Sequence, residues 1–318
     1  MSRLSRLSQW RKKLALPAIA ILLLLALSAF VPEFRLVPMA AFAPTPTATL
    51  PPSTPTPTPS STATRTPTAT RTPRPSATPT VTATPSRLAD ADAEYVPVLM
   101  YHYIRTVDEQ ADPMGYRLSI TPERFAEQME WLRDNDYTPM RMDALSACLR
   151  GLTRCPENPV ALTFDDGYTD AATEALPILE EYGFVATFYV VVNFVGKPGY
   201  MTWEQIELLR DSGMEIGSHT VNHFDLTGLE LGAAQDEIVT SRQLLEERLE
   251  IPVVSFSYPV GSYNSALAGV VHSAGYTNAV IVLPGDSITH MYEIPRRRVL
   301  GGESIAGFPW YMVPVAVE

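Results

Sequence analysis

The sequence of 318 residues contains only two cysteines and has no excess of basic side chains. Two cysteines are too few to staple a small disulfide scaffold or to build a cysteine-rich metal cluster. Cys148 and Cys155 lie seven residues apart and could form one small disulfide. Two free buried thiols are the alternative. The formal net charge of −11 argues against a partner with a phosphate backbone, and we expect no nucleic-acid binding.

The acidic charge is unevenly placed along the chain. Residues 1–90 carry ten of the 24 Lys and Arg but only two of the 35 acids, Glu33 and Asp90. Residues 91–318 therefore hold 14 basic and 33 acidic side chains, a formal balance of −19. Such a surface keeps a domain soluble, and it would also suit a neutral or cationic glycan.

Residues 44–86 lack acidic side chains and have almost no large apolar ones, whereas 12 of these 43 positions are proline and 16 are threonine. A segment of this composition cannot bury enough apolar surface to offset its ordering entropy. We expect residues 44–94 to form a disordered stalk, about 130 Å long if residues 44–86 adopt extended polyproline II. Its threonines are candidates for O-glycosylation, and the alternative is a tether whose only property is length.

The N-terminal 43 residues have the pattern of an export segment. Five basic residues between Arg3 and Lys13 precede Leu14–Val31, an apolar run broken only by Pro17 and Ser28. A helix of this length spans about 27 Å, barely the core of a bilayer. We interpret it as a signal-anchor, with a cleaved signal peptide as the alternative, because the small-x-small sequence at 41–43 lies well beyond the run. The domain that follows is then extracytoplasmic, either membrane-anchored or secreted.

Short apolar runs alternate with amphipathic stretches from Tyr95 onward. Strands are expected at 96–101, 160–164, 186–192, 214–217, 253–257 and 278–282, and helices at 121–135, 171–182, 202–211, 233–249 and 265–274. Thr121 and Thr202 have the character of helix caps, each followed by an early acid. Alternating strands and helices imply an α/β domain with a parallel sheet, most simply an irregular (β/α) barrel over residues 95–318.

The stretch V-A-L-T-F-D-D-G-Y-T-D, residues 160–170, is an apolar strand that ends in two adjacent carboxylates and a glycine. Asp165 and Asp166 repel each other unless a cation neutralises one or one of them holds a proton. An ordinary Asp-Gly turn after a strand is the simpler interpretation of this stretch alone.

A second cluster, M-E-I-G-S-H-T-V-N-H at residues 214–223, places His219 and His223 at i, i+4 spacing. If the chain turns helically there, both imidazoles project from one face. Two imidazoles with one carboxylate suit a divalent metal such as zinc and leave positions open for water and substrate. On its own the pair would be a solvated turn, but beside the Asp-Asp-Gly strand end it favours a metal site.

These two stretches resemble the motifs of the NodB-type polysaccharide deacetylases, carbohydrate esterase family four. T-F-D-D-G at 163–167 is similar to the first motif of that family, and H-T-x-x-H at 219–223 to the second, within a likeness that covers roughly 96–299. The resemblance implies that Asp165 is the catalytic base and that Asp166, His219 and His223 hold the metal. Zinc is the first expectation for that metal, with cobalt, nickel and manganese as alternatives.

The general acid of this family ordinarily lies in a late L-x-x-H motif, but no histidine follows His290 here. The exopolysaccharide N-deacetylases with permuted motif order carry this histidine at the first strand, and V-L-M-Y-H at 98–102 resembles theirs. The likeness assigns His102 as general acid. A hydrogen-bonded structural histidine is the alternative for a strand end.

The third motif departs from the family form. F-S-Y-P-V-G at 256–261 aligns with F-R-x-P-Y-G, so Tyr258, Pro259 and Val260 are expected at the oxyanion and substrate site, and the Val260 amide would serve whatever its side chain is. Ser257 stands where an arginine is common. The resemblance to a late I-P-R motif lets Arg296 supply the missing cation, although Arg297 and Arg298 lie beside it and a surface basic cluster is the alternative.

The expected function is metal-dependent removal of N-acetyl groups from an acetylated polysaccharide. O-deacetylation of xylan or of a cell-wall ester needs the same site and is an alternative. A catalytically silent carbohydrate-binding module is the other, and it would have lost its base or a metal ligand. The sequence implies contact with a membrane through the N-terminal helix and implies no protein partner.

Overall fold

The computed structural model describes residues 95–282 and 288–314. The predicted export helix and the predicted stalk lie outside these residues. None of the helices within the two ranges has the length and apolar character that a membrane crossing requires.

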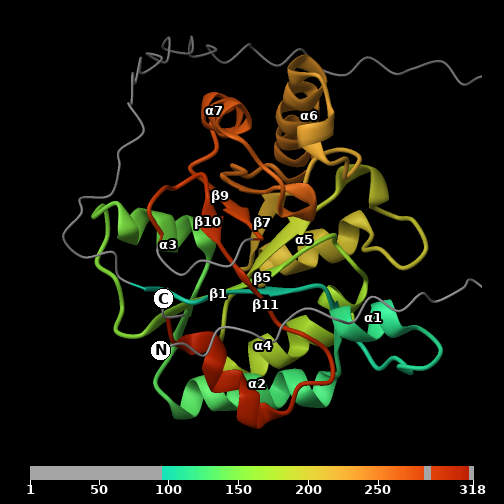
Figure 1. Ribbon diagram of the computed structural model, residues 1–318, viewed down its shortest axis with the longest axis vertical. Coiled ribbons are helices and arrows are strands. Elements are labelled where there is room, and N and C mark those ends of the chain that lie inside the picture. The colour runs from blue at the N-terminus through green and yellow to red at the C-terminus, as the bar shows by residue number, and fades with distance from the viewer. Residues whose placement is uncertain (1–94, 283–287, 315–318) are drawn as a thin grey trace, which may run out of the picture. The chain divides into compact units, whose positions relative to one another are not determined.

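A nine-stranded sheet whose pairings are all parallel forms the centre of the domain (Figure 1). Its strands are β1 (Val98–Tyr101), β4 (Thr138–Met140), β5 (Pro159–Phe164), β6 (Thr187–Val190), β7 (Glu215–Ser218), β8 (Ser255–Ser257), β9 (Asn278–Ile281), β10 (Ile294–Pro295) and β11 (Arg297–Arg298). The pairing order is β10-β9-β8-β7-β6-β5-β1-β11, and β4 pairs with the first half of β5. A separate two-stranded sheet joins β2 (Tyr103–Ile104) to β3 (Ser119–Ile120).

A single stretch of chain connects the two edges of the large sheet. β10 pairs with β9, and one residue later β11 pairs with β1, the strand at the other end of the order. The sheet therefore returns on itself as a parallel barrel, and Arg296 lies at the point of closure. This confirms the expected α/β barrel architecture, with β10 and β11 as strands that the sequence did not predict.

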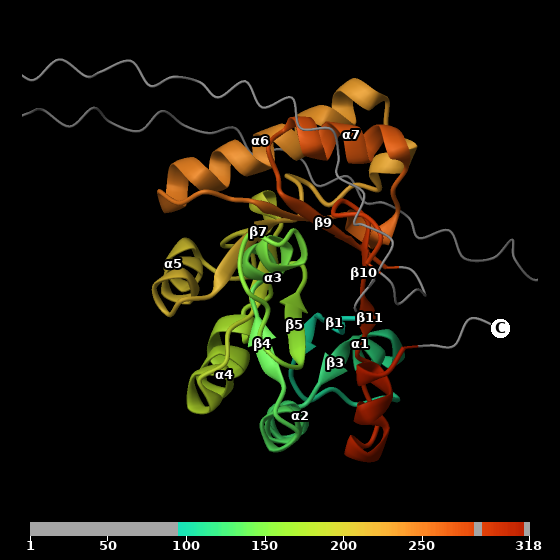
Figure 2. The ribbon, with the colours of Figure 1, turned by 90° about the vertical axis from the view of Figure 1, so that its left-hand side faces the viewer.

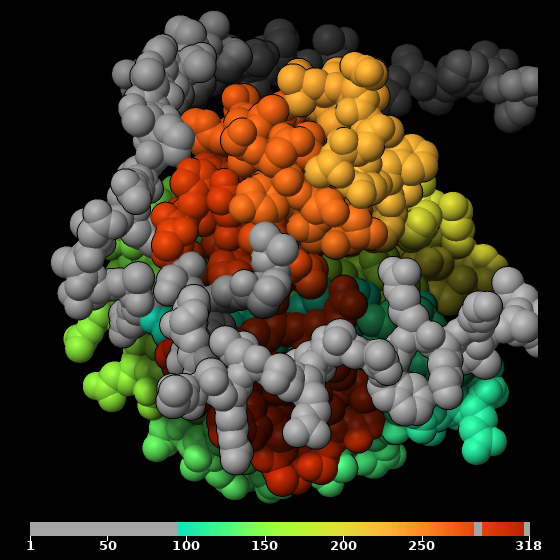
Figure 3. All heavy atoms as spheres, in the orientation of Figure 1, coloured from blue at the N-terminus to red at the C-terminus, as the bar shows by residue number. Residues whose placement is uncertain are grey.

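Helices cover the outside of this sheet (Figures 1 and 2). They are α1 (Pro113–Leu118), α2 (Pro122–Asp134), α3 (Met142–Leu149), α4 (Leu176–Tyr182), α5 (Trp203–Asp211), α6 (Leu231–Leu249) and α7 (Ser265–Ser273). The space-filling view shows α6 and α7 side by side on one surface, above the C-terminal segment that includes the 3-10 helix Ile305–Met312 (Figure 3). Most helices follow a strand, which is the alternation that the sequence predicted.

The two faces of the strands differ in chemistry. Phe164 stacks on Tyr101 and Phe188, and Phe125 of α2 packs edge-on against the first two rings. These buried rings therefore face the helix layer. The alternate residue Thr163 and its neighbours on the other face point into the barrel, where polar groups gather. The barrel interior consequently has room for charged side chains only where they are paired.

The ends of several elements differ from the sequence predictions. Thr121 and Thr202 cap α2 and α5 as expected, and Thr202 forms a full capping box with Gln205. The predicted helix 171–182 begins as a π-helical turn, Ala171–Ala175, before α4. The sequence did not predict α1, α3 or β4. The central residue of β4 is Pro139, which has no N–H to donate to the sheet. A proline argues against a strand, so the sequence did not indicate β4.

The polar contacts of α3 fix it at the amino ends of the strands. The Met142 N–H donates to Thr187 Oγ1 at 2.9 Å, and the Asp143 N–H donates to the buried carboxylate of Glu215 at 3.0 Å. A disulfide between Cys148 and Cys155 then closes the loop after this helix, so of the two alternatives left by the sequence the bonded pair is found. This end of the barrel is closed, and the carboxyl ends of the strands are left for chemistry.

Candidate active site

The carboxyl ends of the barrel strands bring the predicted residues together. Asp165 and Asp166 directly follow β5, His219 follows β7, and His102 follows β1. Parallel strands have their carboxyl ends on one side of a barrel, which is the usual place for catalytic side chains. The turn after β5 uses left-handed backbone at Asp166 (φ 73°) and Gly167 (φ 79°). This sharp reversal sends two adjacent carboxylates to different partners.

Asp165 forms a buried two-pronged ion pair with Arg296. Arg296 Nη1 donates to Asp165 Oδ1 at 2.7 Å and Nη2 donates to Oδ2 at 2.6 Å, with the arginine side chain fully buried. Burial opposes ionisation of Asp165, but the charges of Arg296 and His219 outweigh it and lower the pKa of Asp165. A carboxylate held in this way is ionised and fixed in orientation.

Arg296 also supplies the cation that the third motif lacks, because Ser257 stands where an arginine is common. Its Nη2 donates to Ser257 Oγ at 3.0 Å, and its Nη1 donates to Thr163 Oγ1 at 3.1 Å. Because Ser257 is short, the guanidinium enters from the β10–β11 segment instead of from β8. Of the three neighbouring arginines, Arg297 is half-buried and Arg298 is exposed. The geometry thus selects Arg296 from the cluster.

Asp166, His219 and His223 form a compact group of metal-ligating side chains. The Nε2 atoms of His219 and His223 lie 3.4 and 3.2 Å from Asp166 Oδ1. One ligand atom from each of the three residues lies within 4.8 Å of the others. The expectation of a helical turn is wrong, because Thr220 and His223 adopt left-handed backbone (φ 69° and 62°) in a non-helical loop. The two imidazoles converge through this loop.

The hydrogen bonds around these histidines suit a metal. His219 Nδ1 lies 2.8 Å from the carbonyl oxygen of Ser257, so Nδ1 carries the proton and Nε2 is left to bind. Burial raises the pKa of Asp166, but the interactions with His219 and His223 outweigh it and lower that pKa well below its ordinary value. Two imidazoles and one ionised carboxylate are a donor set that zinc and similar divalent metals accept. The residues present therefore fit the expected ion.

His102 lies close enough to both carboxylates for their charges to act on it. Burial lowers the pKa of His102, and the negative charges of Asp165 and Asp166 only partly offset that effect. A low pKa makes the imidazolium a ready proton donor, although it leaves a smaller share of the side chain protonated at neutral pH. The structure thus brings His102 to the carboxyl ends of the strands, near Asp165 and Asp166.

The three residues of the third motif have different exposures. Tyr258 is fully buried and packs edge-on against Phe256, so its side chain cannot touch a substrate, and Pro259 is also buried. Val260 is 60% exposed and has a left-handed backbone (φ 53°). Within the described part of the chain its backbone N–H has no hydrogen-bond partner. Of these three residues only Val260 is available to a substrate.

A row of stacked aromatic rings beside the metal ligands was not predicted. The Tyr103 and Tyr168 ring centroids lie 3.7 Å apart, Tyr168 and Tyr200 5.0 Å apart, and Tyr200 and Phe194 4.8 Å apart. Burial and the negative charge of Asp166 raise the pKa of Tyr168. These residues come from three separate segments of the chain, so no spacing within the sequence could have grouped them. Tyr103 and Tyr168 directly follow the motifs at His102 and Gly167, which is the signal that was available.

A parallel barrel with an arginine-paired carboxylate and an Asp-His-His group at the carboxyl ends of its strands has the side chains that metal-assisted hydrolysis needs. The family model described as polysaccharide deacetylase matches residues 153–279. Over 219 residues the chain is 33% identical to YxkH of Bacillus subtilis strain 168, whose printed name is putative polysaccharide deacetylase. The match covers 68% of this chain and 76% of that protein. The chain belongs to the polysaccharide deacetylase family.

Two further relatives bear on the site. The chain is 33% identical over 131 residues to a poly-β-1,6-N-acetyl-D-glucosamine N-deacetylase of Escherichia coli K12, 36% of this chain but only 19% of that enzyme. The solved structure of the Streptococcus pyogenes deacetylase PplD in complex with acetate is 25% identical, with a TM-score of 0.65, and the match covers 73% of this chain and 100% of that one. The family thus agrees with the one that the sequence motifs resemble.

Proposed function

We propose that this protein removes N-acetyl groups from an amino-sugar polysaccharide by metal-assisted hydrolysis. The observation that carries the proposal is the separation of two adjacent carboxylates. Asp165 is paired with Arg296, whereas Asp166 contacts His219 and His223. One carboxylate is therefore free of the metal and can act as a base, while the other is a ligand. The E. coli relative, whose name states N-deacetylation of a glucosamine polymer, supports the amide as substrate.

Each side chain then has one role. Asp166, His219 and His223 would hold a divalent metal, which would supply polarisation of the acetyl carbonyl and a more nucleophilic water. Asp165 accepts the proton of the attacking water, and Arg296 keeps that carboxylate ionised and correctly turned. The exposed Val260 N–H donates to the developing oxyanion. His102 gives a proton to the departing amine.

The test is acetate release by the purified protein. We expect acetate from N-acetylglucosamine polymers, loss of that activity with a chelator, and recovery when zinc, cobalt, nickel or manganese is returned. O-acetylated xylan in parallel separates the amide from the ester substrate, since the same site could open either. Release from the ester alone would replace N-deacetylation by O-deacetylation, and release from neither would overturn the proposed function.

The location of the domain is proposed from the sequence alone. A basic flank, an 18-residue apolar run and a Thr/Pro-rich segment would hold the deacetylase domain outside the cytoplasm, on a stalk. The full chain should then sediment with membranes and be digested by protease added to intact cells. Recovery of the intact chain from the cytoplasm would contradict this placement.

A further inference from the structure

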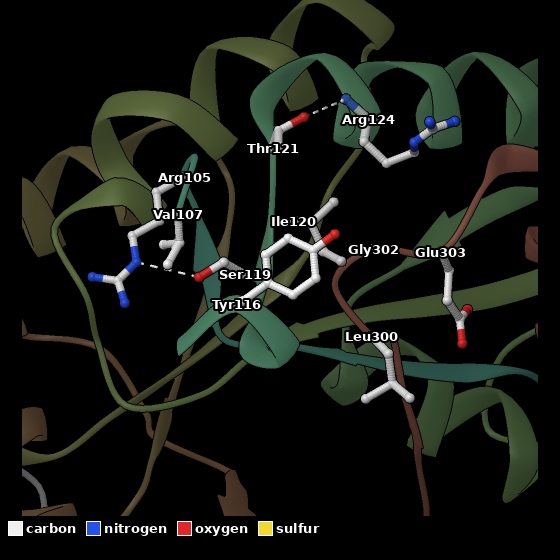
Figure 4. Close-up of a pocket in the computed structure, with 10 residues that line it drawn as sticks. All are labelled: Arg105, Val107, Tyr116, Ser119, Ile120, Thr121, Arg124, Leu300, Gly302 and Glu303. Atoms are coloured by element: carbon white, nitrogen blue, oxygen red, sulfur yellow. Dashed lines mark hydrogen bonds between the residues drawn. The ribbon is translucent and has the colours of Figure 1, made fainter. Parts of the chain in front are cut away.

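A pocket with a volume of about 220 Å³ lies beside the β1 and β11 ends of the barrel (Figure 4). Its walls come from the segment after β2, from α1, from the start of α2 and from the loop after β11. Because β2 follows β1 and the α2 start follows β3, these segments belong to the carboxyl side of the barrel. The pocket therefore shares a face with His102 and Asp165.

Stacked side chains connect this pocket to the metal ligands. Arg105, which lines the pocket, holds its guanidinium carbon 3.6 Å from the centre of the Tyr103 ring. Tyr103 in turn stacks on Tyr168, which lies two residues after Asp166 in the turn that follows β5. Only two aromatic rings thus lie between the pocket wall and a metal ligand. A short oligosaccharide could reach from one to the other along the rims of these rings.

The pocket wall offers both donors and acceptors. Arg105 Nε donates to Ser119 Oγ at 3.2 Å, which fixes the guanidinium in the wall and leaves its other N–H groups to bind. Arg124, Tyr116 and Glu303 also line the pocket (Figure 4). Mixed donors and acceptors around a few apolar contacts match the hydroxyls and ring faces of a sugar.

We propose that this pocket binds one sugar unit of the glycan, next to the units held at the catalytic site. The inference rests on the proposed function, because it assumes a glycan substrate. The volume supports a single unit, since ligand sites for larger molecules usually measure about 300–1,000 Å³. The charges support a neutral sugar. Arg124 of the pocket lining is paired with Glu127, and the lining contains the acidic Glu303 as well as the basic Arg105.

The experiment compares short with long substrates. Acetate release is measured with N-acetylglucosamine dimers and hexamers, in both β-1,4 and β-1,6 linkage. Arg124→Ala removes donors from the pocket, and Val107→Trp fills it. Arg133→Ala, an exposed change on the same helix with its own ion pairs, is the matched control. Melting temperatures of all variants are recorded first, so that a folding defect is recognised.

In both pocket variants we expect the ratio of kcat/KM for hexamer to that for dimer to fall roughly tenfold, mainly through KM, equivalent to about 1.4 kcal/mol. The control should keep the wild-type ratio. An unchanged ratio in both folded pocket variants would overturn the sugar site while leaving the proposed function in place. No acetate from any oligomer with the wild type would instead remove the proposed function itself.

Discussion

Replacing Arg296 by methionine tests whether the Arg296–Asp165 ion pair stabilises the fold as a buried pair does, rather than as weakly as a surface pair. The methionine keeps much of the volume but removes the cation that holds Asp165. Both side chains of the pair are almost fully buried, at 0% and 5% exposed, and two hydrogen bonds join them. Asp165 would then be a buried charge without its main partner. Thr163 and Ser257 would lose a donor as well.

The expected cost follows from that burial. Removing one partner of a buried pair typically destabilises a protein by roughly 3–5 kcal/mol, a large part of a usual total of about 5–15 kcal/mol. For a domain of this size the loss corresponds to a fall in melting temperature of roughly 6–20 °C. Arg133→Met, whose pairs are about half exposed, should leave the melting temperature unchanged.

Chemical denaturation of the purified variants measures this loss, and a double-mutant cycle identifies its source. Asp165→Asn alone leaves the buried Arg296 charge without its partner, whereas the double variant leaves no unpaired charge. We therefore expect the double variant to be considerably more stable than the sum of the two single losses predicts. Additive losses, or an Arg296→Met variant as stable as wild type, would refute the view that this pair anchors the site.

Two further predictions concern buried titratable groups. The pKa of Glu215 is raised by burial from 4.5 to about 7, so this group stabilises the fold most below about pH 4.5, and that contribution is lost as the pH rises to 7. Relative to Glu215→Gln, wild type should lose roughly 3 kcal/mol of unfolding free energy between pH 4.5 and 7.5, and a pH-independent difference would count against this explanation. His102→Ala should retain metal but slow amide hydrolysis more than hydrolysis of an activated ester, whose leaving group departs without a proton. Equal losses on the two substrates would return His102 to a structural role.

The barrel could be predicted because its strands are buried on both faces and therefore appear as short continuous apolar runs. β6, β8 and β9 lie within predicted segments, and β5 and β7 each extend one residue beyond theirs. β10 and β11 have two residues each, one strand containing a proline and the other two arginines, so no periodicity distinguishes them. They exist because closure of the sheet supplies a partner strand on each side. Only the folded barrel could therefore choose Arg296 among three adjacent arginines.

At the site, strand ends were predictable and loop paths were not. The motifs located both carboxylates and both histidines, and the fold brings them together. The convergence of His219 and His223, however, depends on a left-handed threonine at position 220. A β-branched residue rarely adopts that conformation, so the residue types at 219–223 do not indicate this path of the chain. The aromatic row at Tyr168 was missed because its members meet only through tertiary contacts.

The separate roles of Asp165 and Asp166 are tested most directly by measuring metal content and acetate release on the same samples. The wild type should carry about one equivalent of divalent metal. Asp165→Asn should retain that metal and lose most acetate release, because the amide cannot accept the proton. Asp166→Asn should lose metal and regain some activity when metal is added in excess. A metal-free wild type that still releases acetate, or an Asp165→Asn variant with normal turnover, would contradict the mechanism.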